Sequence, residues 1–143
     1  MTPLRISTDP SALDVPMIHR FLASQSGWAR GIPLEVVETS LRHSLCFAGF
    51  IDAEQVAFAR VISDQATFAY LADVFVLPAY RGRGYAAALL AAIVADARLQ
   101  GLRRFLLATA DSHALYARFG FTRPAHPERF MQRHVEDAYA RSR

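Results

Sequence analysis

The sequence predicts an α/β fold: one mixed β-sheet of about six or seven strands, flanked by about four helices on both faces. The 143 residues have the length of one ordinary domain. Apolar residues make up 52% and charged residues only 20%, which favours a buried core over disorder. Runs with strand and helix periodicity follow one another in a mixed order, which is typical of this class.

The first half predicts a short strand, two helices and a β-hairpin. The strand is expected at residues 4–6, and helical spacing of apolar residues follows at 12–23 and 33–42. Pro16 and Pro33 are expected near helix starts, where a missing N–H costs little. Residues 45–51 and 55–62 then have the composition of two strands joined by a tight turn.

The second half predicts a strand–helix–strand unit. Residues 68–77 are the most strand-like stretch and end before Pro78, which cannot donate to a ladder. Residues 84–100 carry an apolar stripe at helical spacing, with Gly101 as the cap, and 104–108 form a second strand. A right-handed crossover between parallel strands is therefore expected here.

Two further elements are expected near the C-terminus. Residues 112–119 predict a short helix with Asp111 as its N-cap. Residues 130–133 predict a last edge strand, and the basic tail after it is expected to fray.

Composition excludes several classes of protein. The longest nearly apolar run, 85–95, is too short to cross a bilayer, and the first residues lack the apolar core of a signal peptide. We therefore expect a cytoplasmic protein without a membrane partner. The single cysteine, Cys46, excludes an internal disulfide and a multi-cysteine metal site; we expect a buried structural thiol and no metal. The net charge of +3 suits an anionic ligand, but dispersed basic residues argue against nucleic acid.

The loop that joins the strand at 68–77 to the long helix is the most informative segment. It contains Gly82 and Gly84 interleaved with Arg81 and Arg83. The first turn of a helix leaves backbone N–H groups without partners and carries partial positive charge. The glycines remove side chains that would keep a phosphate away, and the arginines add two full charges. The segment therefore predicts a cradle for a pyrophosphate.

Two other interpretations of this loop stay open on the residues alone. It could be an ordinary turn with solvated arginines. Gly82, Gly84 and Ala87 also fit the dinucleotide fingerprint G-x-G-x-x-A. The acid that should follow about twenty residues later is missing, and few further βα units fit behind the loop.

Two segments resemble the GNAT superfamily of N-acetyltransferases. The acetyl-CoA motif of that family, R/Q-x-x-G-x-G/A, stands here as Arg81-Gly82-Arg83-Gly84-Tyr85-Ala86, shortly after Pro78. A second signature follows about thirty residues on, as Ala114-Leu115-Tyr116-Ala117-Arg118-Phe119-Gly120-Phe121. The resemblance is strongest over residues 70–121, and residues 1–45 match only in outline.

This resemblance implies a single N-acetyltransferase domain over residues 1–143, with acceptor-site helices at 12–42 and an acetyl-CoA-binding core at 68–121. The implied reaction moves an acetyl group from acetyl-CoA to a primary amine, on a small molecule or a peptide, by direct attack in a ternary complex. A CoA-binding regulatory module without turnover and a dinucleotide-binding protein are the alternatives. Dimers are common in this family, so a homodimer is also an expectation.

The resemblance assigns the acid and the cofactor contacts. Tyr116 would donate a proton to the departing thiolate, because a phenol is protonated at pH 7; a plain core aromatic is the alternative. The backbone of the strand end would bond the pantetheine arm and polarise the thioester, and the loop amides would hold the pyrophosphate. The residues expected to contact the cofactor are Val74, Phe75, Val76, Arg81, Gly82, Arg83, Gly84, Tyr85 and Ala86.

Candidates for the acceptor side come from the residues themselves. Asp73 interrupts an apolar strand and is the leading proton acceptor, with a salt bridge to Arg60, a backbone cap or a water chain as alternatives. Strand alternation places Asp73 on the face opposite Val74 and Val76. Trp28 and Arg30 could form a lid over the acceptor; a hydrophobic staple between the first helices explains Trp28 equally well.

Overall fold

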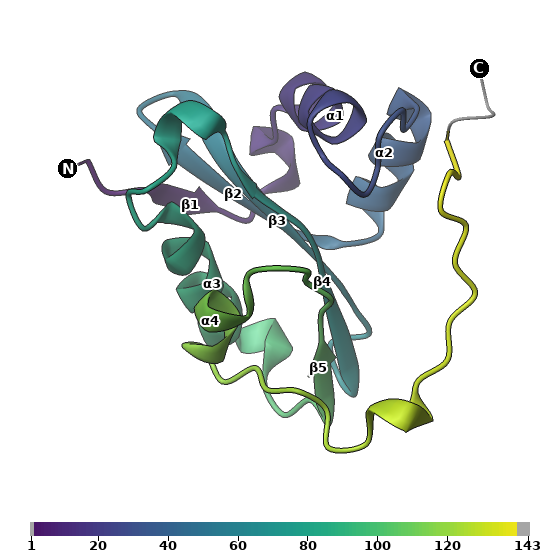
Figure 1. Cartoon of the computed structure of the whole chain (residues 1–143). Coiled ribbons are helices and arrows are strands. Elements are labelled where there is room, and N and C mark those ends of the chain that lie inside the picture. The colour runs from purple at the N-terminus through teal and green to yellow at the C-terminus, as the bar shows by residue number, and fades with distance from the viewer. Residues whose placement is uncertain (1, 140–143) are drawn as a thin grey trace.

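The backbone of the computed structural model forms one mixed sheet in the order β1-β2-β3-β4-β5 (Figure 1). The structure describes residues 2–139. Neighbouring strands are antiparallel except for the parallel pair β4–β5. The sheet is mixed, as predicted, but the described residues form five strands rather than six or seven. The strands are β1 (Arg5–Ser7), β2 (Leu45–Ile51), β3 (Glu54–Ser63), β4 (Phe68–Val76) and β5 (Arg104–Leu106).

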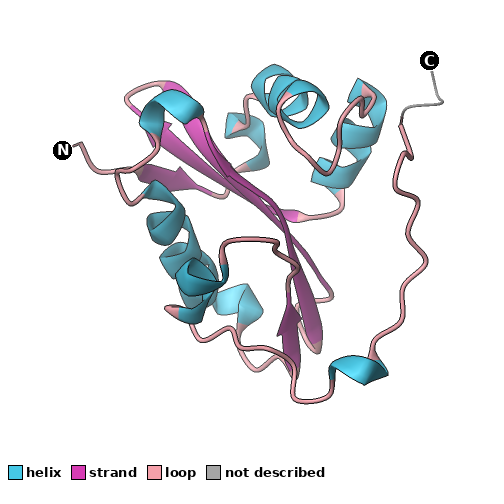
Figure 2. Cartoon of the chain, in the orientation of Figure 1, coloured by secondary structure: helices cyan, strands magenta, loops and turns pink. Residues whose placement is uncertain are grey.

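Four α-helices accompany the sheet within residues 2–139, in agreement with the predicted number (Figure 2). Two lie between β1 and β2, one crosses from β4 to β5, and a short one follows β5. They are α1 (Val15–Ser24), α2 (Leu34–Arg42), α3 (Tyr85–Ala95) and α4 (His113–Ala117). No helix in the described part of the chain is long and apolar enough to cross a membrane.

Two apolar clusters pack against the sheet. One contains Leu89 and Ile93 of α3 with Ala59 of β3, and we call this side the α3 face. The other contains residues of α1 and α2 with Phe58 of β3 and Phe75 of β4, and we call it the α1/α2 face. Phe58 and Ala59 are consecutive, and successive side chains of a strand point to opposite faces of the sheet. The two clusters therefore lie on opposite faces of β3.

The helices begin or end at other residues than predicted where a side chain forms a hydrogen bond to the backbone. α1 begins at Val15 rather than residue 12, because the Asp14 carboxylate accepts from Met17 N–H at 3.1 Å, with Pro16 in the first turn. α3 ends at Ala95 rather than residue 100. There the Asp96 side chain accepts from Arg98 N–H at 2.8 Å and starts a 3₁₀ turn instead. The N-cap of α4 is Ser112, not Asp111.

The last predicted strand, 130–133, is wrong for this chain. After a 3₁₀ turn at Pro127–Arg129 the backbone leaves the sheet and runs toward α2 (Figure 1). Phe130 reaches only the start of β5, where the Arg104 guanidinium lies 4.8 Å from its ring centroid. Residues 130–133 therefore pair with no strand in the described part of the chain.

The topology does not suit the dinucleotide alternative. A dinucleotide-binding fold needs a mostly parallel sheet with several crossover helices. Among the strands of residues 2–139, only the pair β4 and β5, which α3 joins, is parallel.

Core burial generates a first prediction. Leu89→Ala removes a fully buried side chain from the α3 face and should lower the free energy of unfolding by about 2–5 kcal/mol. Leu34→Ala is the matched control, because Leu34 is 41% exposed at the start of α2, and we expect it to cost less than about 1 kcal/mol. Urea denaturation of both variants measures the difference; equal costs would contradict this account of the core.

Candidate functional site

The loop before α3 has the backbone of an anion cradle. Gly82 and Gly84 are left-handed, with φ of 79° and 81°, and Gly84 is the N-cap of α3. In the first backbone hydrogen bond of the helix, Ala88 N–H donates to the Gly84 carbonyl. The six amides from Gly82 to Ala87 donate to no group within residues 2–139. Successive N–H groups that lie free at a helix N-terminus attract an anion.

A hollow of about 180 Å³ lies at this loop and reaches α4. Its lining joins the end of β4, the loop, the first turn of α3 and one side of α4. The lining residues are Val76, Tyr80, Arg81, Gly82, Gly84, Tyr85, Ala86, Ala87, Leu115 and Arg118. The two sequence segments that resembled the GNAT family therefore meet in space.

Side chains in the loop also make contacts within the chain. Arg81 Nε donates to the Val76 carbonyl at 2.9 Å, so this guanidinium joins the loop to the end of β4. Arg83 lies over the Tyr80 ring, 5.3 Å from its centroid. The Tyr85 side chain is buried and donates to the Thr2 carbonyl at 2.7 Å. Of Tyr85, only the backbone is available to a ligand.

β4 and β5 separate toward the loop. Their pairing covers only Phe68 to Tyr70 of β4, which then continues to Val76. Leu77 N–H bonds to the Val56 carbonyl at 2.8 Å, which makes Ala57 and Val76 a pair without mutual hydrogen bonds. The N–H and C=O of Val76 therefore face away from β3, into the space left by β5. The Phe75 side chain lies elsewhere, stacked on Phe21 of the α1/α2 face at 3.9 Å between centroids.

Tyr116 sits on α4 between two residues that line this hollow, Leu115 and Arg118. The ring is half-buried and meets Phe121 edge to face, 6.1 Å between centroids. Burial, and to a smaller extent the Asp111 carboxylate, raises the pKa of Tyr116 above its usual value. Its hydroxyl makes no hydrogen bond to the described residues. Tyr116 is thus a protonated phenol whose O–H has no partner in the described part of the chain, although its own side chain is not among those that line the hollow.

An extra residue interrupts β4 opposite β3. The register shifts between Phe58 and Arg60, and Asp73 has a left-handed φ of 54°. Leu71 and Val74 both pack on the α3 face, although strict alternation would separate an odd from an even residue. The bulge lets Asp73 turn to the α1/α2 face while Val74 and Val76 stay on the α3 face. The predicted opposition of Asp73 to these two valines is thus confirmed.

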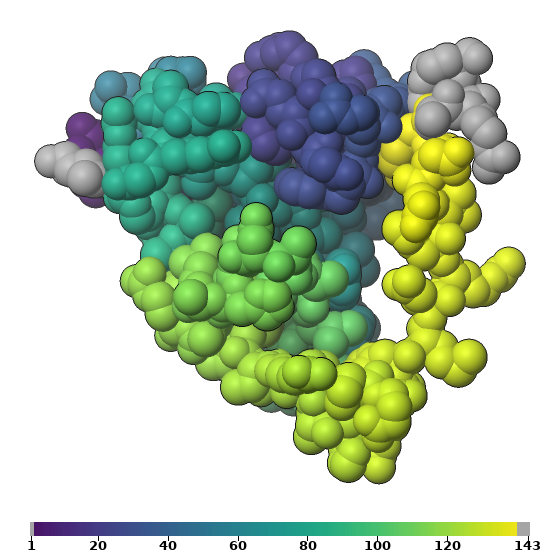
Figure 3. Space-filling view, viewed as in Figure 1, coloured from purple at the N-terminus to yellow at the C-terminus, as the bar shows by residue number. Residues whose placement is uncertain are grey.

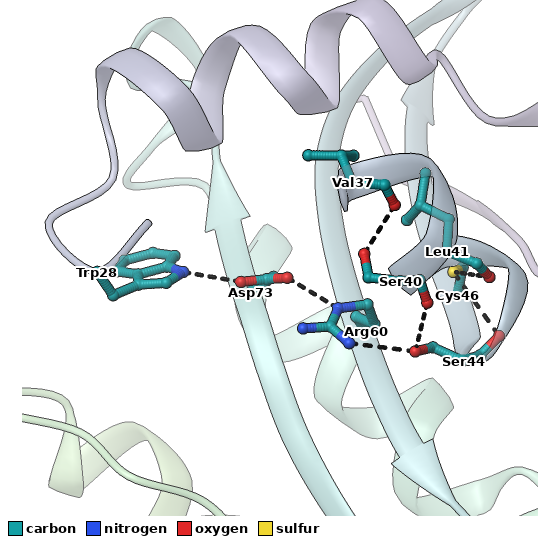
Figure 4. A network of polar contacts seen from close by, with 8 residues as sticks. All are labelled: Trp28, Val37, Ser40, Leu41, Ser44, Cys46, Arg60 and Asp73. Carbon is teal, nitrogen blue, oxygen red and sulfur yellow. Dashed lines mark hydrogen bonds and ion pairs between the residues drawn. The ribbon is translucent and has the colours of Figure 1, made fainter. Parts of the chain in front are cut away.

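Asp73 is the centre of a polar network between the loop after α1 and the sheet (Figure 4). Its Oδ1 accepts from Trp28 Nε1 at 2.7 Å, and its Oδ2 forms an ion pair with Arg60 Nε at 2.8 Å. The salt bridge to Arg60, weighed as an alternative for Asp73, is therefore present. The Trp28 ring is 56% exposed despite this bond.

The network continues from Arg60 to the connection between α2 and β2, and then into α2, through residues that sequence reasoning missed. Arg60 Nη1 donates to Ser44 Oγ at 3.2 Å, and Ser44 Oγ donates to the Ser40 carbonyl at 2.7 Å. Isolated serines carry no signal for such a chain. Arg30 is not part of it: its Nη1 donates to the Ser24 carbonyl at 3.3 Å, at the end of α1.

Cys46 lies next to this network and is buried, as predicted. Burial raises the pKa of the thiol to about 11, with the Arg60 charge opposing the shift and the Asp73 charge adding to it. The thiol is thus protonated at neutral pH and does not react as a nucleophile. Residues 2–139 contain no group of three or more His, Cys, Asp or Glu side chains that could hold a metal.

The Arg60–Asp73 pair gives a second prediction. Arg60→Ala leaves a largely buried carboxylate without its cation and should lower the free energy of unfolding by about 1–3 kcal/mol. Arg98→Ala is the control, because the Arg98–Asp96 pair has the same 2.8 Å separation but its arginine is 39% exposed against 16% for Arg60. That loss should stay below about 1 kcal/mol by the same thermal or urea measurement. If Arg98→Ala lost more stability than Arg60→Ala, the difference in burial would not explain the strength of these two ion pairs.

Comparisons with known proteins agree with this geometry. The model of the acetyltransferase (GNAT) family matches residues 15–121. A Gibberella zeae protein named as a candidate acetyltransferase is 33% identical over 135 residues, covering 79% of this chain and 75% of its own. A crystal structure from Xanthomonas campestris pv. campestris, described as a candidate acetyltransferase of the GNAT family, is 58% identical, with a TM-score of 0.95 and coverage of 98% of this chain and 99% of that one.

A more distant structure shows the same fold. The Clostridium acetobutylicum chain, described as a predicted acetyltransferase with acetyl-CoA, is 16% identical with a TM-score of 0.66 and covers 94% of this chain and 96% of its own. The match over residues 15–121 includes both the loop before α3 and the α4 segment. On the strength of this match and of the 33% identical relative, the chain belongs to the GNAT family of acetyltransferases.

Proposed function

We propose that this protein is an N-acetyltransferase that moves an acetyl group from acetyl-CoA to a primary amine, with both substrates bound together. The observation that carries the proposal is the row of six free amides from Gly82 to Ala87, placed beside the open edge of β4. The row suits a pyrophosphate, and the strand edge suits a chain of amides such as pantetheine. CoA joins these two groups in one molecule.

The cofactor would follow the surface from the loop to the strand. The amides from Gly82 to Ala86 would hold the pyrophosphate, with the Arg83 charge close by. Arg81 would act indirectly, by tying the loop to the Val76 carbonyl. The pantetheine amides would pair with the β4 backbone where β5 has separated from it. The acetyl-CoA in the name of the Clostridium acetobutylicum structure supports this ligand for the fold.

Acetyl-CoA supplies an activated acyl thioester, and the chain would promote its transfer with two groups. The Val76 amide, which faces away from β3, would donate to the thioester carbonyl oxygen. A preorganised donor of this kind contributes up to about 3–4 kcal/mol to transition-state stabilisation. As the amine nitrogen bonds to the carbonyl carbon and the C–S bond breaks, Tyr116 would give its proton to the sulfur. Its raised pKa keeps that proton available.

The acceptor amine would enter from the α1/α2 face. An ionised carboxylate offers about four lone-pair sites, and Trp28 and Arg60 occupy two of those on Asp73. The remaining sites would receive the amine and its proton, directly or through a water chain. The exposed Trp28 ring would cover the acceptor, because its bond to Asp73 holds the loop after α1 across the sheet.

The reaction itself is tested by the release of free CoA. The full chain with acetyl-CoA and a pooled amine panel should release thiol only when an acceptor is present. Tyr116→Phe should lower that rate at least tenfold, as loss of a general acid typically costs about 10²–10⁴. A thiol reagent can follow release at pH 8, because Cys46, with its pKa of about 11, contributes no background.

Acetyl-CoA binding by the wild-type chain and by Tyr116→Phe provides the control for this activity test. Acetyl-CoA should raise the melting temperature of the wild-type chain and of Tyr116→Phe equally, since the phenol is assigned no part in binding. An unchanged rate in Tyr116→Phe would remove the tyrosine from the mechanism. A rise in melting temperature without release for any amine would favour a CoA-binding module without turnover.

The cradle has a test of its own. Gly84→Ala places a side chain on a left-handed residue among the free amides, and should weaken acetyl-CoA binding at least tenfold in a calorimetric titration. Gly101→Ala is the matched control: Gly101 is also left-handed, with φ of 73° and open space around its Cβ position, but lies after α3. Both should lose about 1–2 kcal/mol of stability, and only Gly84→Ala should lose affinity. Equal affinities would place the pyrophosphate elsewhere.

A further inference from the structure

The α1/α2 face of the sheet carries exposed apolar side chains at the end of β3 and the start of β4. Ile62 and Tyr70 lie opposite each other across the two strands. Their neighbours Val61 and Leu71 are buried on the α3 face, so this pair points to the α1/α2 face. Phe68 shares that face, two residues before Tyr70. Ile62 is 42% exposed, Phe68 is 36% exposed and Tyr70 is half-buried. We call these three residues the apolar strip.

Neither α1 nor α2 covers the apolar strip. The cluster that these helices form against β3 and β4 uses Phe58 and Phe75, and none of the three strip residues belongs to it. The C-terminal segment stands away from the sheet. Residues 131–135 make no hydrogen bond to the described part of the chain, and Figure 3 shows open space between this yellow segment and the body. The strip is therefore accessible to a ligand.

The strip continues into the polar network around Asp73. Arg60 and Ile62 are two residues apart on β3, so they share a face of the sheet. Figure 4 shows the Trp28 ring, Asp73 and Arg60 in line across the two strands. An amine at Asp73 would meet the exposed indole there. About 10 Å along β4 it would reach Tyr70, where the strip begins.

No carboxylate accompanies the strip. Residues 60–63 of β3 and 68–72 of β4 include no acidic side chain. The next carboxylate along the chain, Asp64, is already occupied, because it accepts from the backbone and the hydroxyl of Thr67. A second ammonium group on the acceptor would therefore find no partner along the strip.

The strip offers little to other polar groups. Arg60 is the one cation within residues 60–63 and 68–72, and Asp73 opposes its charge at 2.8 Å. The Tyr70 hydroxyl, which makes no hydrogen bond within residues 2–139, is the one polar side-chain group of the strip. A carboxylate or a sugar would lose bound water here for few partners, whereas burial of carbon is favourable.

We propose that the acceptor is a primary amine with an uncharged apolar body, which lies along the apolar strip while its nitrogen is held at Asp73. This substrate class rests on the acetyl transfer proposed above. Ile62 and Phe68 would set the specificity by covering the body of the acceptor, and the Trp28 ring would cover the carbons next to the nitrogen. The bound acceptor is thus what buries these exposed side chains.

Three amines with the same four-carbon chain test the class: butylamine, 4-phenylbutylamine and 1,4-diaminobutane. The ring of 4-phenylbutylamine is too far from the nitrogen to change its basicity, so its comparison with butylamine isolates the apolar body. With acetyl-CoA and the full chain, CoA release should give 4-phenylbutylamine a kcat/KM at least about tenfold above that of butylamine. The diamine should show none of this gain. Equal values for all three, or a preference for the diamine, would overturn this substrate class and leave acetyl transfer standing.

Two variants of the strip test its role. Ile62→Thr/Phe68→Thr removes apolar surface but keeps a β-branched side chain that strands accept. It should reduce the preference for 4-phenylbutylamine over butylamine to about threefold or less. Ile62→Val/Phe68→Leu is the matched control and should keep the preference, because both positions stay apolar. If the threonine variant keeps the preference but changes the mass of the chain in light scattering, the strip is a contact between copies and not a substrate site.

A binding measurement without turnover separates this substrate class from the reaction. Trp28 is the only tryptophan of the chain, so its fluorescence reports on this site alone. With CoA present, 4-phenylbutylamine should shift the emission to shorter wavelength, because its body covers an indole that is 56% exposed. Half-saturation should come at a concentration at least about tenfold below that of butylamine. Such binding without CoA release for any amine would refute acetyl transfer alone, and the absence of a saturable shift would refute the apolar acceptor.

Discussion

The extra residue at Asp73 decides which face of the sheet each later side chain of β4 meets. Without it, Val76 would lie on the same face as α1 and α2, and Phe75 could not stack on Phe21. A left-handed aspartate in a strand costs about 1–3 kcal/mol of backbone strain, which the surrounding contacts must offset. Arg60 and Trp28 hold the carboxylate from two directions, so the bulge and the loop after α1 stabilise each other. Both halves of the proposed site depend on this one residue.

The two halves divide the chemistry by face. On the side of α3 the proposed cofactor contacts come mainly from the backbone, through free amides, a strand edge and a left-handed loop. On the side of α1 and α2 side chains dominate, through an indole, a carboxylate and a guanidinium in series. The thioester would lie where β4 passes between the two, since Val76 presents its amide there. This separation explains why the cofactor side of the molecule left clear motifs in the sequence and the acceptor side did not.

The parallel pairing of β4 and β5 is short. β5 separates from β4 beyond Tyr70, so only three of its residues pair, and the edge of β4 to which we assign the cofactor is left open. A strand this short, with an open outer edge, contributes little to its own stability.

The sequence by itself determined the elements that rest on local rules: periodicity placed the helices and the three long strands, and glycines interleaved with arginines before α3 marked the cradle. It also placed Asp73 opposite Val74 and Val76, because alternation is a local property. Only the tertiary structure decided that Arg60 rather than a backbone cap pairs with Asp73, that Arg81 bonds to Val76, that Arg30 caps α1, and that Tyr85 is buried. The strand expected at 130–133 is of this second kind. Its residues have strand character, but a strand exists only beside a partner, and where that partner lies depends on contacts between segments far apart in the chain.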